Sequence, residues 1–211
     1  MKQKIFDYDI PSKLDIENFY VSKPNIEAYN YVTSNNQIIK QTIIFGPNKS
    51  GKTHLGLIWK NNNNAIIFND KKYEYALNNR KNIFIDNFFE NLDEEQLFHI
   101  INHCANHNLK ILLTSNKLLN DYKFKYLDLS SRLKSFNFIN INIPNDELIH
   151  NLLIKLLSDK QIIIHNSEIF SFILKRINRT YENIYSLVEK IDKLSLEKKR
   201  QLTIPLIREL L

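Results

Sequence analysis

Short apolar runs alternate with longer amphipathic stretches along the first two thirds of the chain. Five of the runs have the length and the branched or aromatic content of buried strands. They are residues 42–45, 65–68, 82–85, 110–114 and 138–143. Apolar positions at helical spacing predict helices at about residues 24–33, after residue 53, and over residues 93–107. The pattern predicts an α/β core with five strands.

The hydrophobic period becomes helical throughout after Pro144. The predicted helices cover residues 146–157, 167–177, 180–194 and 203–211, and Pro205 falls in the first turn of the last one. Residues 1 to about 20 are polar and aromatic without a clear period. We therefore expect an extended N-terminal arm, the α/β core, and a small helical lid after it.

The strongest chemical signal lies between the first strand and the helix after it. Residues 46–53 read GPNKSGKT and fit the phosphate-binding pattern G-x-x-x-x-G-K-[ST]. In this pattern backbone N–H groups and a helix N-terminus surround a polyphosphate, the lysine (Lys52) reaches the β- and γ-phosphates, and the hydroxyl of Thr53 binds Mg²⁺. A plain glycine turn is the alternative, but the chain has three glycines and two are in the motif. The predicted nucleotide-binding residues are Gly46, Pro47, Asn48, Lys49, Ser50, Gly51, Lys52, Thr53 and His54.

Two later strands also end in polar residues that suit this chemistry. Asp86 follows the third apolar run, where P-loop folds place a carboxylate that holds Mg²⁺. An acidic strand cap is the simpler alternative. The fourth strand ends at Thr114, and Asn116 soon after it would lie at the same edge of the sheet as the P-loop. We therefore predict Thr53 and Asp86 as metal residues, with Asn116 near the terminal phosphate.

Composition limits the function classes but does not choose among them. The net charge of +6 is compatible with a role near nucleic acid, yet both signs are interspersed along the chain. The single cysteine excludes an internal disulfide, and neither a signal peptide nor an apolar run long enough for a membrane span is visible. We expect a soluble cytoplasmic protein.

Two further patterns admit both a functional and a structural interpretation. His99, His103 and His107 recur every four residues, which permits a metal site, although a solvated helix face explains them better. Residues 122–126 alternate aromatic and basic side chains, a pattern that can stack on nucleic acid. A surface loop or edge is the simpler reading of that segment.

The order of these motifs resembles that of AAA+ ATPases, and most closely the DnaA-like family with regulators of the Hda type. The stretches that carry the resemblance are residues 21–28, 46–55, 85–87, 113–116, 128–133 and 202–205. The resemblance implies a five-stranded parallel P-loop core at residues 21–144 and a lid at 145–211, after an arm at 1–20. It also implies that the chain binds ADP or ATP with Mg²⁺.

Residue roles follow from the same resemblance. Asp86 corresponds to the Walker B acid, Asn116 to the sensor 1 residue, and Arg132 to the arginine finger that reaches a neighbouring subunit's nucleotide. A surface arginine at the end of a short helix is the alternative for Arg132. Asn87 replaces the second Walker B acid, and an amide cannot act as a base.

The lid departs from the family pattern as well. Glu182 replaces the sensor 2 arginine, and Arg179 is a possible substitute from the preceding turn. A carboxylate at position 182 would repel phosphate. The departures at residues 87 and 182 indicate at most a weak intrinsic ATPase.

The implied function is regulation of replication initiation. Regulators of this type bind the polymerase sliding clamp through a short N-terminal peptide, which Gln3, Ile5, Phe6 and Tyr8 resemble, and promote ATP hydrolysis by the initiator DnaA. The alternatives are an autonomous AAA+ ATPase of the loader or motor type and a DNA-binding initiator paralogue. Because the sequence stops after the lid, we expect no sequence-specific DNA binding. A homo-oligomer is compatible with the resemblance.

Overall fold

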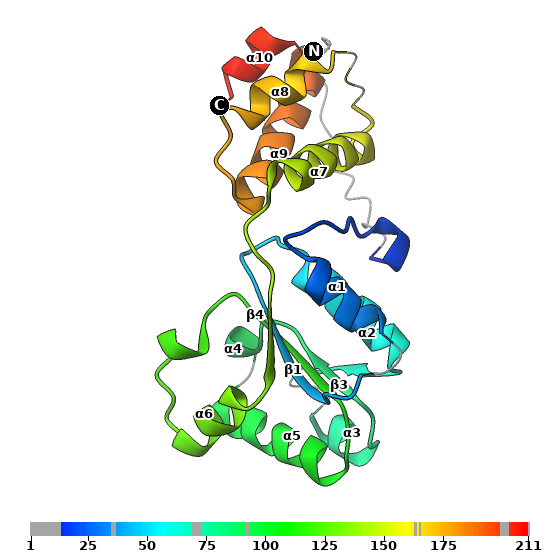
Figure 1. Cartoon of the computed structure of the whole chain (residues 1–211), viewed down its shortest axis with the longest axis vertical. Coiled ribbons are helices and arrows are strands. Elements are labelled where there is room, and N and C mark those ends of the chain that lie inside the picture. Colours follow the sequence, from blue (N-terminus) through cyan, green and yellow to red (C-terminus); the bar gives the residue numbers. More distant parts are fainter. Residues whose placement is uncertain are drawn as a thin grey trace.

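A five-stranded parallel sheet forms the centre of the lower body in Figure 1. The computed structural model describes residues 14–34, 37–68, 73–91, 93–162, 164, 166–198 and 203–210. The strands are β1 (Gln41–Phe45), β2 (Ile66–Ile67), β3 (Ile83–Ile85), β4 (Ile111–Ser115) and β5 (Asn137–Asn140). Their order is β2-β3-β4-β1-β5, so β1 is paired on both sides. The predicted parallel α/β core is confirmed.

Helices cover both faces of the sheet. They are α1 (Ile26–Thr33), α2 (Lys52–Asn62), α3 (Tyr73–Asn78), α4 (Phe88–Asn91), α5 (Glu94–Asn106) and α6 (Leu127–Lys134). Alternating strand residues face opposite layers: Ile43 packs in the cluster with α3, α5 and α6, and Ile44 packs in the cluster with α1 and α2. The core is therefore a three-layer sandwich whose three inner strands, β1, β3 and β4, are buried on both faces.

Local signals explain where the long helices begin. The side chain of Asp93 accepts a hydrogen bond from the Gln96 N–H and caps α5, which carries Glu94 and Glu95 in its first turn. The first lid helix is capped in the same way: the Asn145 side chain accepts a hydrogen bond from the Leu148 N–H. Helices α3 and α4 were missed by the sequence pattern, because six and four residues give too little periodicity, and a short helix at α6 was considered only as the alternative for Arg132.

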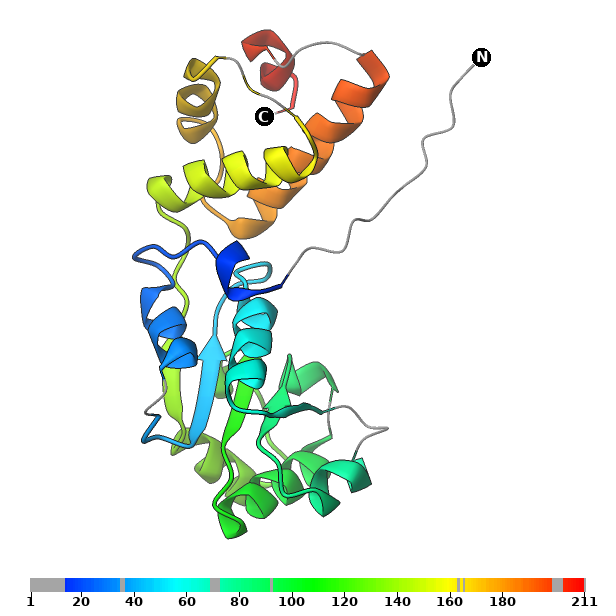
Figure 2. The same cartoon turned by 90° about the vertical axis from the view of Figure 1, so that its right-hand side faces the viewer.

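The lid forms the upper body in Figures 1 and 2. It consists of α7 (Asp146–Asp159), α8 (Glu168–Leu174), α9 (Tyr181–Lys198) and α10 (Ile204–Arg208), with Pro205 in the first turn of α10. These helices pack around an apolar cluster of their own, which includes Ile149, Ile173 and Ile191. Tyr181 of α9 belongs instead to the cluster on the α1–α2 face of the sheet, and so joins the lid to the core.

The two ambiguous patterns lie on the core surface. The ring centroids of His103 on α5 and His107 just after it are 4.3 Å apart, and His99 Nε2 lies 3.9 Å from Glu95 Oε1. Within the described ranges no group of three or more His, Cys, Asp or Glu side chains is arranged to hold a metal. The rings of Tyr122 and Phe124 pack with Phe89. None of the helices in the same ranges is long and apolar enough to cross a membrane.

Candidate nucleotide-binding site

The P-loop connects the end of β1 to the start of α2, as the sequence predicted. Gly51 precedes α2 with φ of +90°, a left-handed conformation that glycine adopts without strain. A Cβ on Gly46 would lie 2.9 Å from both Ile141 Cβ and Ser50 Oγ. Both motif glycines are therefore required by the loop's own geometry, and the loop can bring its backbone close to an anion.

Lys52 places its ammonium group inside the loop. Its Nζ donates hydrogen bonds to the carbonyl oxygens of Gly46 at 2.9 Å and Pro47 at 2.7 Å, and the residue is 6% exposed. Burial lowers the pKa of Lys52, and the charges of Asp86 and Glu90 act in the opposite direction. The Ser50 hydroxyl is buried and has no hydrogen-bond partner among the residues that the structure describes. The Lys52 ammonium group and the buried Ser50 hydroxyl are both donors that could bind the oxygens of a polyphosphate.

A chain of hydroxyl and carboxylate groups lies beside the P-loop. Thr53 Oγ1 donates to Asp86 Oδ2 at 2.7 Å, and Thr114 Oγ1 donates to Asp86 Oδ1 at 2.5 Å. The structure thus brings the two predicted metal residues together across β1, β4 and β3. Oxygen ligands of this kind are those that Mg²⁺ prefers, so the residues present fit the ion.

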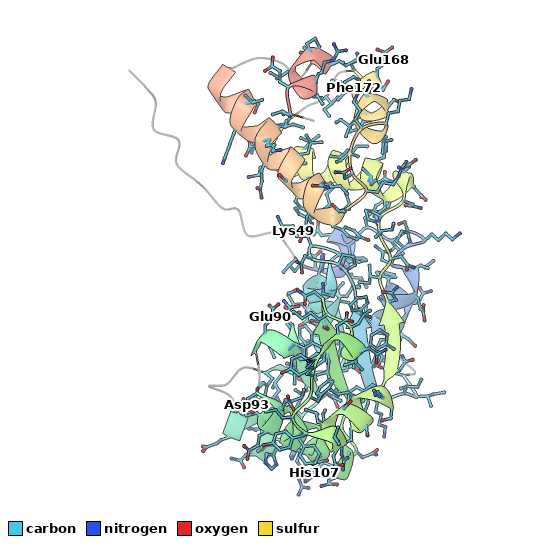
Figure 3. The ribbon with its side chains drawn as sticks, turned by 90° about the vertical axis from the view of Figure 1, so that its left-hand side faces the viewer. Lys49, Glu90, Asp93, His107, Glu168 and Phe172 are labelled. Atoms are coloured by element: carbon cyan, nitrogen blue, oxygen red, sulfur yellow. The ribbon has the colours of Figure 1, made fainter. Side chains whose placement is uncertain are left out.

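Asn116 lies at the same edge, directly after β4. Its Nδ2 donates to Asn48 Oδ1 of the P-loop at 2.9 Å and to Glu90 Oε1 of α4 at 3.4 Å. Sequence reasoning did not single out Glu90, although its place four residues after Asp86 could have drawn attention to it. Figure 3 shows Glu90 on the core between Lys49 and Asp93 along the long axis of the molecule.

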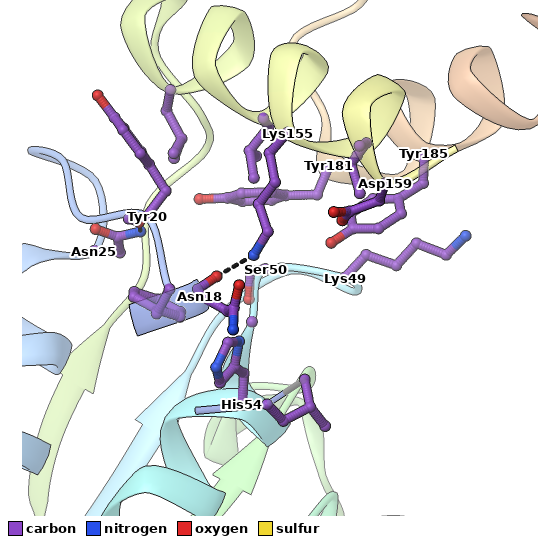
Figure 4. A pocket seen from close by; sticks show the side chains of 16 residues that line it. Asn18, Tyr20, Asn25, Lys49, Ser50, His54, Lys155, Asp159, Tyr181 and Tyr185 are labelled. Atoms are coloured by element: carbon purple, nitrogen blue, oxygen red, sulfur yellow. Dashed lines mark hydrogen bonds between the residues drawn. The ribbon is translucent and has the colours of Figure 1, made fainter. Parts of the chain in front are cut away.

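A cavity of about 160 Å³ opens between the P-loop and the lid, and Figure 4 shows its lining. The core contributes Ser50, Gly51 and His54, and the lid contributes Lys155, Tyr181 and Tyr185. Burial raises the pKa of the Tyr181 hydroxyl to about 12, and that hydroxyl donates to the Asn142 carbonyl at 3.0 Å. Aromatic walls with a few polar groups are typical of small-molecule sites.

Residues 14–20, which the sequence placed in an extended arm, form a wall of this cavity. They include a short 3₁₀ helix, Ile16–Asn18, which lies between core and lid in Figures 1 and 2. The Phe19 ring meets the His54 ring edge-on at 5.2 Å between centroids and covers Gly51. This part of the arm expectation was wrong, because Phe19 is an apolar side chain with a core surface to cover. Gln3, Ile5, Phe6 and Tyr8 lie outside the described residues.

The same segment contacts both bodies through hydrogen bonds. His54 Nε2 and the Asp15 carbonyl oxygen are 2.6 Å apart, and burial lowers the pKa of the His54 imidazole. Lys155 of α7 donates from Nζ to the Asn18 carbonyl, a contact drawn in Figure 4. The segment therefore connects the P-loop helix with the lid.

The lid side of the phosphate region carries negative charge. Glu182 lines a second cavity of about 280 Å³ together with Pro47 and Asn48, so the residue does face the P-loop. Arg179 binds Asp146 instead, with Nε 2.9 Å from Oδ1, and this pair lowers the pKa of Asp146. Arg179 is thus held by its own lid and does not replace the missing arginine. On the same side, Lys49 Nζ lies 3.9 Å from Glu189 Oε1 of α9 and 5.1 Å from the Tyr185 ring centroid.

Arg132 lies apart from all of these groups. It is exposed on α6, at the end of the core away from the lid in Figure 1, and its guanidinium carbon lies 5.3 Å from the Phe98 ring centroid. The structure therefore does not bring Arg132 to the P-loop of its own chain. A role toward a nucleotide would have to be exerted on another molecule.

A family model described as "Hda, lid domain" matches residues 151–211. The DnaA protein of Buchnera aphidicola is 23% identical over 234 residues, which cover 96% of this chain and 53% of that protein. The solved structure of domain III of DnaA from Thermotoga maritima superposes with a TM-score of 0.75, covering 95% of this chain and 96% of that one at 17% identity. The chain is similar to DnaA-like AAA+ proteins over nearly its whole length, and its lid is similar to that of Hda.

Further comparisons agree with this DnaA-like assignment. An uncharacterized protein of Haemophilus influenzae is 25% identical over 218 residues, which cover 93% of this chain and 92% of the relative. AMPPCP-bound DnaA from Aquifex aeolicus gives a TM-score of 0.69 at 20% identity, covering 91% of this chain and 70% of that one. The present chain spans about half the length of the Buchnera DnaA. What these relatives bind or do is considered below as a proposal.

Proposed function

We propose that this chain is an adenine-nucleotide-binding regulator of chromosomal replication initiation that promotes ATP hydrolysis by the initiator DnaA. The lid matches the model of the Hda lid, and proteins of the Hda type are regulators rather than initiators. This match supports the regulatory role. The P-loop, Lys52, Thr53 and Asp86 support binding of ADP or ATP with Mg²⁺, and AMPPCP in the Aquifex DnaA structure makes adenine the expected base. Within this proposal the sliding clamp is bound by the N-terminal peptide.

The position of Arg132 is the observation that carries the proposed mechanism. Because Arg132 is exposed on α6 and its guanidinium lies over Phe98 of α5 rather than at its own P-loop, we assign it to a nucleotide held by another chain. A guanidinium spreads positive charge over phosphoryl oxygens as negative charge develops on them. In well-studied nucleotide switches an arginine supplied in trans is worth on the order of 10³ to 10⁵ in rate.

Arg132→Ala should abolish the stimulation of DnaA's ATP turnover and leave nucleotide and clamp binding by this chain unchanged. Arg132→Lys should restore little, because a point charge does not reproduce the planar fork. The measurement is phosphate release by DnaA in the presence of clamp-loaded DNA and either protein. Lys134→Ala removes an exposed cation from the same helix and should behave as wild type. Stimulation by Arg132→Ala equal to wild type would contradict the mechanism.

An autonomous ATPase is the second candidate function, and Glu90 favours it. This carboxylate lies beside Asn116 and the P-loop. A turnover assay on the isolated chain separates the two, because a motor or loader turns over at about 1 s⁻¹ or faster without any partner. Turnover well below that rate in isolation, together with stimulation of DnaA, supports the regulator.

A further inference from the structure

The backbone after Asp86 does not deliver a carboxylate at the next residue. Asn87 has φ of +44°, and its N–H donates to Thr114 Oγ1 at 2.9 Å. A neutral amide side chain cannot accept a proton from water. Both oxygens of Asp86 accept hydrogen bonds from threonine hydroxyls, which orients that carboxylate as a metal ligand. A base for hydrolysis must therefore come from another residue.

One turn of helix brings Glu90 back to this edge of the sheet. The Glu90 N–H donates to the Asn87 carbonyl at 2.9 Å, so the turn begins at the left-handed residue. Phe88, the first residue of α4, is fully buried, and its ring centroid lies 4.1 Å from that of Phe89. Phe89 stacks in turn on Tyr122, with ring centroids 4.4 Å apart. The turn is thus anchored by two aromatic side chains while Glu90 stays exposed.

Three side chains form a row from α4 to the P-loop. Glu90 Oε1 accepts from Asn116 Nδ2, and Asn116 also donates to Asn48 Oδ1. The Glu90 carboxylate is also near enough for its charge to oppose the burial-induced lowering of the Lys52 pKa. In P-loops the lysine reaches the β- and γ-phosphates of a bound nucleoside triphosphate. Because Glu90 is near Lys52 and Asn48, we expect its carboxylate to lie on the side of the P-loop that would hold the terminal phosphate.

We infer that Glu90 is the general base of this site and supplies the carboxylate that position 87 lacks. The inference rests on the nucleotide binding proposed above. Glu90 would take one proton from a water molecule while the water oxygen forms a bond to the γ-phosphorus. The bond from that phosphorus to the bridging oxygen breaks, its electron pair stays on the β-phosphate, and ADP and inorganic phosphate are the products. Asn116 orients the Glu90 carboxylate.

At the sensor 2 position the lid offers a carboxylate and not a cation. Glu182 faces Pro47 and Asn48, while Arg179 is bound to Asp146 and Lys155 to the Asn18 carbonyl. Charge that develops on the phosphoryl oxygens would therefore be stabilised mainly by Lys52, and a Mg²⁺ ion held by Thr53 and Asp86 would supply further positive charge. Slow but measurable hydrolysis is the expected result.

The test is Glu90→Gln, which keeps the hydrogen bond to Asn116 and removes the base. We expect single-turnover phosphate release, measured with protein in excess over ATP, to fall by about 10²-fold. Calorimetry should show tighter ATP binding, because a negative charge near the terminal phosphate is removed, with ADP affinity little changed. Glu95→Gln, at an exposed carboxylate on α5, should match wild type in both measurements.

Three outcomes would overturn the assignment. They are equal phosphate release by Glu90→Gln and wild type, equal shifts in ATP and ADP affinity, and wild-type release no higher than that of Lys52→Ala. The proposed regulatory function fails separately. Glu90→Gln should still stimulate DnaA through Arg132, so loss of that stimulation in Arg132→Ala alone leaves the Glu90 result intact.

Discussion

The Lys52 ammonium group donates hydrogen bonds to two carbonyl oxygens of its own loop. Those two hydrogen bonds must be exchanged for bonds to phosphate oxygens when a nucleotide enters. The exchange is favourable because a phosphate oxygen carries a full negative charge that attracts the ammonium group more strongly than the partial charge of a carbonyl oxygen does. Opposite this cation, Glu182 contributes a charge of the wrong sign. Affinity at this site is thus set by a small number of side-chain charges.

Glu182→Arg should tighten both ADP and ATP binding several-fold, because it replaces a repulsive charge with an attractive one beside the P-loop. Calorimetry at low and high salt measures the effect, which should shrink as salt rises. Glu168→Arg makes the same charge change in the first turn of another lid helix, α8, and should leave affinity nearly unchanged. Equal tightening by the two variants would show a general charge effect and would contradict the local one.

At the scale of elements, helix α2 and strand β3 pack so closely at Gly56 that no side chain fits between them there. The third glycine of the chain, Gly56, faces the Phe84 ring, and a Cβ at position 56 would lie 1.9 Å from Phe84 Cζ. Both residues are buried on the α1–α2 face of the sheet. The close approach brings the P-loop helix onto the strand that ends at Asp86, and so helps to set the distance between Thr53 and Asp86.

Gly56→Ala should therefore destabilise the fold by about 1–3 kcal/mol, even though alanine is the better helix former. Chemical denaturation measures the change, and Phe84→Leu in the same chain should recover part of the loss by making room. Asn61→Ala, at an exposed position of α2, serves as the control and should be nearly neutral. An unchanged midpoint for Gly56→Ala would mean that the helix can shift away from Phe84 without cost.

The sequence predicted those parts of the site that depend on local pattern. The P-loop, Asp86 and Asn116 were found because each follows an apolar strand, and parallel strands bring their carboxyl ends to one edge. Glu90 was missed because its position depends on a left-handed residue and a four-residue helix, neither of which leaves a periodic signal. Phe19 was missed because its partners, Tyr29 and His54, are distant in sequence. Nonlocal packing decides the position of Phe19, and a short local turn without a periodic pattern decides that of Glu90.

At the scale of the whole molecule, the lid and the core are joined by a small set of contacts around the cavity. Tyr181 packs into the core, Lys49 approaches Glu189 of α9, and Lys155 binds the Asn18 carbonyl. Residues 14–20 take part in this junction. The proposed clamp peptide at Gln3, Ile5, Phe6 and Tyr8 precedes that segment in the chain.

Two truncations should separate clamp binding from nucleotide binding. Deletion of residues 1–10, or Gln3→Ala with Phe6→Ala, should remove clamp binding and leave ADP affinity and thermal stability unchanged. Deletion of residues 1–20 should also weaken ADP binding, because it removes Phe19 from the His54 side of the cavity. Clamp affinity by surface plasmon resonance and ADP affinity by calorimetry give the two readouts. Unchanged clamp affinity after the shorter deletion would contradict the assignment of the peptide.

The segment between those two deletion points has a thermodynamic meaning of its own. Asp15 and Phe19 touch the P-loop helix, Asn18 and Tyr20 touch the lid, and the proposed clamp peptide ends six residues before Leu14 in the sequence. Two ligands of one protein obey reciprocal linkage: the factor by which one changes the affinity of the other is the same in both directions. A titration of this chain with the clamp, with and without ADP, therefore measures in a single ratio how strongly nucleotide binding and the proposed clamp binding are coupled.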